Sequence, residues 1–248
     1  MTKIYAEIIG TMILVFLGNG VVANVFLSKT KGHGHGDGGW LTISVGWSLA
    51  VFMGILVSYP YSGAHLNPSV TIGLAIIGKF DWILVPYYII SQFIGAMLGS
   101  LLVCILYKDH FLETKNEQYK LSVFTTIPSI KNFFSNFLSE VLATFIFIFV
   151  SFFLTEKFIV FHETKYSIVE LGLGAFSSSL IVLGIGLSLG GTTGYAMNPA
   201  RDLGPRIIHS IIPIPGKGKS NWNYAFIPVL GPIVGSIIAS ALYLFFLS

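Results

Sequence analysis

The sequence predicts an all-α membrane protein in which six transmembrane helices and two re-entrant half-helices form an inverted repeat. The first observation behind this prediction is composition: 54% of the 248 residues are hydrophobic and 10% are charged, which is more apolar surface than a soluble core can bury. The second is an internal repeat, in which a glutamate inside an apolar stretch precedes an Asn-Pro pair in each half. The third is that each Asn-Pro pair opens an apolar segment too short to cross a bilayer.

Six apolar stretches are long enough to cross the membrane as helices. The hydrocarbon layer is about 30 Å thick and a helix rises about 1.5 Å per residue, so each crossing needs roughly 20 apolar residues. The first stretch is too long for the apolar part of a signal peptide and contains Glu7, so we expect it to be retained as the first helix. The six stretches lie at Ile4–Leu27, Trp40–Pro60, Trp82–Tyr107, Phe134–Leu154, Ser167–Leu189 and Asn223–Leu247.

Charge and cysteine content exclude several classes of protein. The formal net charge is +3 and the basic residues are scattered through the predicted loops, so nothing resembles a nucleic-acid-binding surface. The single cysteine, Cys104, has no second thiol for a disulfide or a metal site, and we expect it to pack inside the third span. The orientation stays open, because a cytoplasmic amino terminus would give the inner loops fewer lysines than the outer loops, against the positive-inside rule. Those inner lysines are Lys3, Lys79, Lys157 and Lys165.

The two halves of the chain, about residues 1–110 and 134–248, repeat the same landmarks. "EIIGT" begins at Glu7 and "EVLAT" at Glu140, and "GAHLNPSV" in the first half is echoed by "GYAMNPAR" in the second. Glu7 lies 60 residues before Asn67, and Glu140 lies 58 residues before Asn198, so the two copies have nearly the same spacing. Because each copy contains three spans, the second enters the membrane from the opposite side, as in inverted repeats around substrate pathways. We therefore predict a single channel domain over residues 1–248.

A short helical segment follows each Asn-Pro pair. Asparagine can cap the amino terminus of a helix, and proline suits its first turn, where the missing N–H needs no partner. The first segment runs about ten residues to Gly78, which is about 15 Å or half the hydrocarbon layer, and the second runs from Pro199 to about Ile211. Two such half-helices meet near the midplane with their amino termini, which carry free N–H groups and partial positive charge. Irregular backbone at this depth is tolerated inside protein or beside a water-filled cavity, which predicts a pore at the junction.

At these residues the sequence resembles the aquaporin superfamily, and in particular the aquaglyceroporin branch that includes the bacterial glycerol facilitators. The resemblance covers essentially the whole chain and is most specific in "SGAHLNPSVTIG" and "GTTGYAMNPARDLGPR". Asp202 and the "PVLGP" run from Pro228 also resemble the polyol-conducting branch. The resemblance implies the aquaporin fold and a homotetramer in the plasma membrane. It also implies passive conduction of glycerol and water, with urea as a further candidate solute. The sequence has no catalytic dyad in a plausible setting, so we expect no enzymatic activity, cofactor or bound metal.

The resemblance also implies roles for the two asparagines. Asn67 and Asn198 are expected to cap the half-helices through their side-chain carbonyls and to donate hydrogen bonds into the pore from both amide NH₂ groups. Together with the two positive helix ends, these donors are expected to repel cations and to break a proton-conducting chain of water.

The family's outer constriction maps onto Trp47, Gly186, Tyr195 and Arg201. We expect the two aromatic rings to face the carbon edge of a polyol, Arg201 to donate to its hydroxyl oxygens, and Gly186 to leave room for its carbon skeleton. Taken singly, Trp47 also suits an interfacial aromatic belt, Tyr195 ordinary packing and Gly186 a helix contact. Arg201 beside an apolar half-span needs water or a partner, which favours a functional role.

The rivals of passive polyol conduction are, first, a water-selective channel and, second, a proton-coupled transporter. A water-selective relative typically carries histidine where this chain has Gly186, which argues against the first rival. A proton-coupled transporter needs carboxylates inside the membrane, for which Glu7 and Glu140 are the candidates. The family instead implies that each glutamate accepts hydrogen bonds from the re-entrant backbone and holds carbonyls toward the pore. We expect His65 to line the pore rather than to bind a metal, because no second ligand is near it in the sequence.

Two residues depart from the family pattern. Ser69 replaces the usual alanine and adds a hydroxyl near the midplane, and Tyr195 replaces the phenylalanine typical of glycerol facilitators. The phenol of Tyr195 either narrows the constriction or adds a hydrogen bond, so the order of glycerol, urea and water stays open.

Other motifs are expected to carry no chemistry. "HGHGDGG" at His33–Gly39 is interpreted as a flexible loop rather than a metal site, and "GKS" at Gly218–Ser220 lacks the earlier glycine of a phosphate-binding loop. Pairs of glycines four residues apart allow close helix packing, within the chain or between subunits. These pairs are Gly95 with Gly99 and Gly231 with Gly235.

Overall fold

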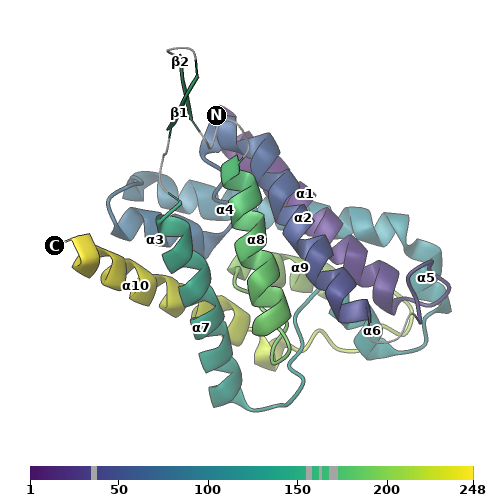
Figure 1. Ribbon diagram of the computed structural model, residues 1–248. Helices are drawn as coiled ribbons and strands as arrows, with labels where there is room; N and C mark the ends of the chain where they lie inside the picture. Colours follow the sequence, from purple (N-terminus) through teal and green to yellow (C-terminus); the bar gives the residue numbers. More distant parts are fainter. Residues whose placement is uncertain (35–37, 155–157, 162–163, 168–172, 248) are drawn as a thin grey trace.

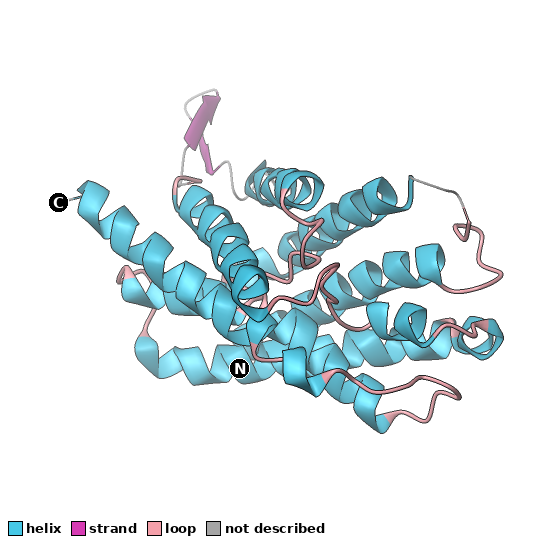
Figure 2. Cartoon of the chain, turned by 90° about the horizontal axis from the view of Figure 1, so that it is seen from below, coloured by secondary structure: helices cyan, strands magenta, loops and turns pink. Residues whose placement is uncertain are grey.

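The computed structural model describes residues 1–34, 38–154, 158–161, 164–167 and 173–247. Within these residues the regular secondary structure is helical apart from one short pair of strands (Figure 1, Figure 2). The described part contains five helices that are long and apolar enough to cross a membrane. They are α1 (Thr2–Phe26), α2 (Gly38–Ser62), α4 (Val85–Leu106), α7 (Phe133–Phe152) and α10 (Ile227–Leu247). Short 3₁₀ turns, η1 (Trp82–Leu84) and η2 (Trp222–Tyr224), precede α4 and α10.

The fifth predicted span begins later than expected. Ser167, its predicted first residue, is the last residue of strand β2 (Thr164–Ser167), which pairs antiparallel with β1 (Phe158–Phe161). Helix α8 (Leu173–Ser188) follows, and residues 168–172 lie outside the described residues. The boundary was wrong because a short apolar run has the same hydropathy at the end of a strand as at the start of a helix.

The two predicted half-helices are α3 (Pro68–Ile76) and α9 (Pro199–Ile211). Beyond α3 the chain reverses at Gly78, whose φ of 71° lies in the left-handed region that glycine adopts without steric penalty. The carboxyl end of α9 is satisfied by Lys217, whose ammonium group donates to the carbonyls of His209, Ser210 and Ile212. A cation there also complements the negative end of the helix dipole. Two further short helices, α5 (Lys108–Glu113) and α6 (Glu117–Ser122), connect the halves.

Glycines let the long helices approach closely. Helix α1 packs against α2 and α4, and α7 packs against α10. A Cβ atom placed on Gly95 would lie 2.4 Å from the backbone carbonyl oxygen of Ile8, and one on Gly235 would lie 2.4 Å from that of Val141. Gly99 and Gly231 make similar contacts with α1 and α7. All four predicted packing glycines therefore face a neighbouring helix of the same chain rather than a surface left for another subunit.

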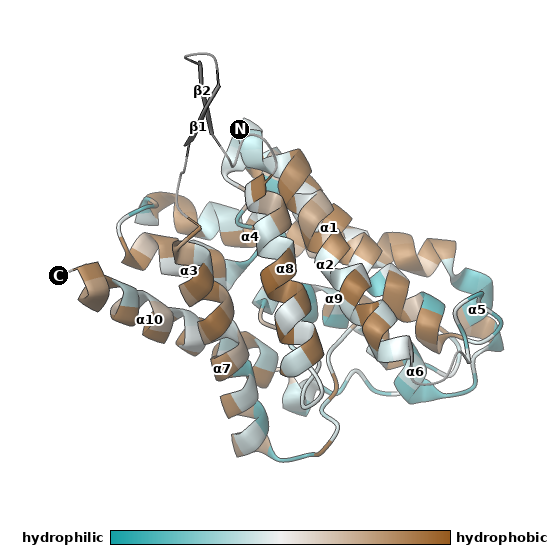
Figure 3. Ribbon diagram, in the orientation of Figure 1, coloured by the Kyte–Doolittle hydropathy of each residue, from teal (hydrophilic) through white to brown (hydrophobic). Residues whose placement is uncertain are grey.

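The outer surface of the helices is apolar. Figure 3 shows hydrophobic residues along the long helices and hydrophilic residues gathered at α5 and α6. Large side chains such as Ile90 and Leu244 are exposed near the start of α4 and near the end of α10. Buried positions hold many small or polar residues instead, among them Ser58, Ser100 and Ser240. This inside-out distribution suits lipid as the solvent, and the chain is an integral membrane protein.

Candidate functional site

The two half-helices meet through a reciprocal pair of hydrogen bonds. Asn67 and Asn198 each cap their own helix by accepting from a backbone N–H in its first turn, at 2.8 and 3.0 Å. Each amide then donates across the junction. Nδ2 of Asn67 donates to the carbonyl of Met197, and Nδ2 of Asn198 donates to the carbonyl of Leu66, both at 2.8 Å. One N–H of each amide is thus used by the protein, so one remains for a solute rather than the whole NH₂ group.

Glu7 holds the loop that precedes α3. Its carboxylate is fully buried and accepts hydrogen bonds from the backbone N–H groups of His65 and Leu66, at 2.9 and 2.8 Å. The Ser62 hydroxyl and the Gln92 amide donate to the same carboxylate, at 2.7 and 2.8 Å. These four donors satisfy a buried charge that is very unfavourable without partners.

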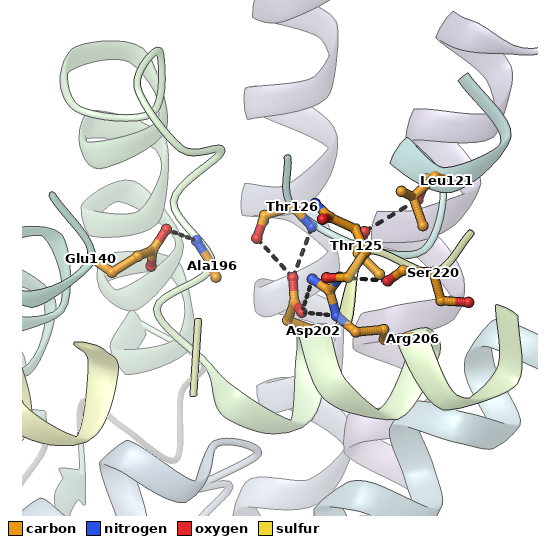
Figure 4. Close-up of polar contacts among 9 residues, drawn as sticks. Leu121, Thr125, Thr126, Glu140, Ala196, Asp202, Arg206 and Ser220 are labelled. Carbon is orange, nitrogen blue, oxygen red and sulfur yellow. Dashed lines mark hydrogen bonds and ion pairs between the residues drawn. The ribbon is translucent and has the colours of Figure 1, made fainter. Parts of the chain in front are cut away.

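Glu140 plays the same geometric part in the second half. It is fully buried and accepts from the backbone N–H groups of Ala196 and Met197, each at 3.0 Å. Figure 4 shows the contact with Ala196. Each glutamate therefore binds the two N–H groups that come just before the capping asparagine of its own half.

The glutamate contacts fix the direction of the loop carbonyls. Because a trans peptide is planar, each C=O points opposite to the N–H of the next residue. Donation to Glu7 and Glu140 therefore turns two carbonyls in each loop away from the glutamates. Positive φ angles at alternate residues of the loops accompany this geometry, 50° at Leu66 and 49° at Met197. The residues that carry the four carbonyls are Ala64, His65, Tyr195 and Ala196, and all four line one cavity.

Three cavities follow one another through the molecule. The central one, of about 130 Å³, is lined by both asparagines and by His65. A cavity of about 280 Å³ adjoins it and shares Ala64 and Val70 in its lining. A cavity of about 110 Å³ adjoins it on the other side. The central and the 110 Å³ cavities share three lining residues, Trp47, Tyr195 and Arg201.

Three of the four predicted constriction residues thus lie where the central and the 110 Å³ cavities meet. The Arg201 guanidinium carbon lies 4.0 Å from the centre of the Trp47 ring, within cation–π distance. Both side chains are buried, and among the described residues the guanidinium forms no hydrogen bond or ion pair. The indole N–H of Trp47 is likewise buried without a hydrogen-bond partner in the described part of the chain. The guanidinium of Arg201, whose residue lines both cavities, is thus the donor available to a solute.

The fourth constriction residue, Gly186, lies behind Tyr195 and lines neither cavity. A Cβ atom on Gly186 would lie 3.0 Å from Cζ of Tyr195, so the glycine makes room for the tyrosine ring. Ser69 also lies away from the cavity. Ser69 is fully buried, and its backbone carbonyl accepts from the hydroxyl of Ser236 in α10 at 2.6 Å.

His65 belongs to the loop that precedes α3 and lines the central cavity. Its Nδ1 lies 3.1 Å from the Thr71 hydroxyl, which also accepts from the Gln92 amide at 2.9 Å. Its ring packs against Phe80 and Tyr88, with ring centres 4.5 and 4.8 Å apart.

A buried ion pair beside the second loop was not anticipated from the sequence. Asp202 accepts from Nη2 of Arg206 at 2.6 Å and from both the backbone N–H and the hydroxyl of Thr126, at 2.8 and 2.7 Å (Figure 4). Arg206 also donates to the carbonyls of Ser220 and Asn221, at 2.8 and 2.9 Å. The pair therefore ties two connecting segments to α9. The four-residue spacing of an acid and an arginine in a half-span is the signal that could have revealed it.

Cys104 is buried in α4, as expected. The His33–Gly39 segment is described only in part, because residues 35–37 lie outside the described residues.

Comparison with known proteins shows extensive similarity. The model of the family "Major intrinsic protein" matches residues 1–243. The glycerol uptake facilitator protein of Streptococcus pneumoniae is 47% identical over 246 residues, which cover 99% of this chain and 100% of the relative. The probable glycerol uptake facilitator protein of Thermotoga maritima is 46% identical over 98% of both chains. The solved structure of the aquaglyceroporin from Plasmodium falciparum is 35% identical, with a TM-score of 0.80 over 98% of this chain and 94% of that one.

The structural similarity confirms the predicted fold class, six membrane helices with two half-helices, of which α8 is the shortest of the six as described. The similarity in sequence extends over the whole chain and includes both halves of the repeat. The chain therefore belongs to the major intrinsic protein family.

Proposed function

We propose that this protein is a passive channel that conducts glycerol and other small neutral solutes, together with water, and excludes protons and ions. The observation that carries the proposal is the junction of α3 and α9, where two capped helix ends meet inside a row of cavities. Relatives named glycerol uptake facilitators, similar over the whole chain, support glycerol as the solute.

The geometry supports a stepwise path for a polyol. At the constriction, the guanidinium of Arg201 donates to hydroxyl oxygens while the rings of Trp47 and Tyr195 contact the carbon edge. Further in, the loop carbonyls accept from the hydroxyl hydrogens. At the junction, the remaining N–H of Asn67 and of Asn198 donates to a hydroxyl or water oxygen. A neutral polyol can therefore exchange its water shell for protein groups along the whole path.

The same groups account for ion exclusion. The amino termini of α3 and α9 carry partial positive charge of roughly half a unit each, and Arg201 adds a full charge at the constriction. A cation meets repulsion at both places. A water molecule at the junction accepts hydrogen bonds from both asparagines, which interrupts a chain of donors along which a proton could hop.

The contacts of the two glutamates weigh against proton-coupled transport. Glu7 accepts four hydrogen bonds and Glu140 accepts two from the backbone of its loop. Protonation would replace an acceptor by a donor that faces other donors, which breaks the loop geometry. These carboxylates are therefore suited to hold the loops and poorly suited to bind and release protons in each cycle.

Stopped-flow light scattering on vesicles that contain the purified protein tests the proposal. Glycerol, urea and water permeabilities are measured at two transmembrane pH gradients and compared with protein-free vesicles. We expect glycerol permeability well above that of lipid alone, linear in the glycerol gradient and unchanged by the pH gradient. Saturable uptake, or accumulation driven by the pH gradient, would contradict a passive channel.

We further propose that the protein is a homotetramer in the plasma membrane. The family resemblance supports this assembly, and the apolar outer faces of the helices suit contact with either lipid or a second copy.

A further inference from the structure

The ring of Tyr195 lies over two glycines one helical turn apart. A Cβ atom on Gly190 would lie 2.4 Å from Cδ1 of Tyr195, and one on Gly186 would lie 3.0 Å from Cζ. A side chain at Gly190 could not coexist with the ring where it lies, and one at Gly186 would require the ring to shift by a few tenths of an ångström. The end of α8 and the residues after it therefore form one wall of a socket for this aromatic side chain.

Trp40, near the start of α2, forms a second wall of the socket. Its ring meets that of Tyr195 edge to face, with centres 5.8 Å apart and an angle of 85° between the planes. Its indole N–H donates to the backbone carbonyl of Gly186 at 2.9 Å. Trp40 is thus anchored to the same glycine over which the tyrosine ring lies. Such an aromatic pair contributes more than its buried area alone, because the ring edge and ring face are electrostatically complementary.

The phenol end of Tyr195 points into the socket. Its hydroxyl is buried, and a Cβ atom on Gly186 would lie 3.1 Å from both this hydroxyl and that of Ser44 in α2. The residue nevertheless lines the central and the 110 Å³ cavities. The ring therefore presents carbon to the passage and keeps its oxygen away from it.

The backbone does not by itself fix the ring. Tyr195 has a φ of 37°, and Ala64, at the matching position of the first repeat, has a φ of 53°. The same left-handed backbone thus carries a methyl group in one half and a large aromatic ring in the other. The ring needs support beyond the backbone, and the socket supplies it.

We propose that Trp40 is a positioning residue that sets the width of the constriction by holding Tyr195 against α8. This inference rests on the proposed function, since it concerns the passage of solutes. Without the indole, the tyrosine ring relaxes into the space that Trp40 filled, and the passage beside Arg201 widens. Trp40 itself is 37% exposed and lines only the 110 Å³ cavity, so its effect on the narrowest point is indirect.

The test measures selectivity rather than flux alone. Trp40→Ala, Trp40→Phe and the wild type are reconstituted, and the permeability of a four-carbon linear polyol is divided by that of glycerol. We expect this ratio to rise about threefold to tenfold in Trp40→Ala, the size of effect that loss of one aromatic pair produces. Trp40→Phe keeps a ring but loses the N–H donor, so its ratio is expected between the other two. Trp82→Ala, which removes an exposed tryptophan remote from the cavities, is the matched control and is expected to keep the wild-type ratio.

The ratio separates positioning from a merely structural role, because loss of folded protein lowers both permeabilities equally. A wild-type ratio in Trp40→Ala would overturn the inference and leave the channel proposal intact. If Trp40→Ala does not fold, a wild-type ratio in Trp40→Phe overturns it instead. A wild-type protein without glycerol permeability above that of lipid alone would overturn the proposed function itself.

Discussion

Glu140 shows how one side chain determines the course of an irregular loop. Its two carboxylate oxygens each accept from a backbone N–H of the second loop, and no apolar or amide side chain can accept at both positions. The carbonyls on the other side of those peptides point away from Glu140 as a consequence, and the residues that carry them line the central cavity. The loop is therefore shaped by a residue more than fifty positions away in the sequence.

We predict that Glu140→Gln destabilises the protein. The glutamine NH₂ group would face a backbone N–H, and a buried donor left without an acceptor costs about 1–3 kcal/mol. Thermal unfolding in detergent measures the loss. Glu113→Gln is the control, since Glu113 forms an exposed ion pair with Lys29 that water and salt screen, and its loss is expected to leave the melting temperature nearly unchanged. Equal melting temperatures for Glu140→Gln and the wild type would contradict the proposed support of the loop.

Gly186 contacts the ring of Tyr195 and lines neither the central nor the 110 Å³ cavity. We predict that Gly186→Ala lowers glycerol permeability about tenfold while water permeability falls less, because the new methyl group pushes Tyr195 toward Arg201. Gly184→Ala, on the same helix with nothing within 4 Å of the added Cβ, is expected to behave as wild type. An equal loss of glycerol and water flux would show that the tyrosine does not move into the passage.

The sequence predicted individual residues well where they belong to a repeated pattern. The capping role of Asn67 and Asn198 follows from the Asn-Pro pairs, since the cap and the first helical turn are local. Partners brought together by the fold were not predictable in this way. Gln92 reaches Glu7 from α4, and Trp40 reaches Tyr195 from α2, across separations that no local pattern encodes.

At the scale of elements, the pairs of long helices are joined by small residues. Helices α1 and α4 approach so closely at Gly95 that even a methyl group would contact a backbone oxygen. Without a hydrophobic driving force in lipid, such close packing is what holds membrane helices together.

We predict that Gly95→Ala destabilises the protein by about 1–3 kcal/mol, the usual result of adding a carbon to a packed interior. Gly20→Ala in α1 has nothing within 4 Å of the added Cβ and is expected to be neutral or stabilising by up to about 1 kcal/mol, because alanine favours helix. Melting temperatures of the two variants provide the comparison. A stable Gly95→Ala variant would mean that α1 and α4 can separate at little cost.

The elements themselves were predictable to different degrees. Long apolar runs predicted five of the membrane helices correctly. Length and hydropathy are enough for this prediction, because a segment inside lipid must form a continuous helix. The start of α8 and the β1–β2 pair were not foreseen, because segments outside the hydrocarbon layer are free of that requirement. Helices α5 and α6 were missed for the same reason.

At the scale of the whole molecule, the resemblance predicts four copies of the chain in one assembly. We expect native mass spectrometry of the protein in mild detergent to give a tetramer as the main species. Chemical cross-linking in intact membranes checks that detergent has not produced the assembly. A monomer in both measurements would contradict the homotetramer and leave the path within each chain unaffected.

The two halves of the molecule differ at matching positions, with Ala64 on one side of the junction and Tyr195 on the other. A pore with unlike ends still passes an uncharged solute equally well in both directions at equal concentrations, since without an energy source it cannot favour one direction of flow. Retention of the solute in a cell must then come from chemistry that consumes it after entry.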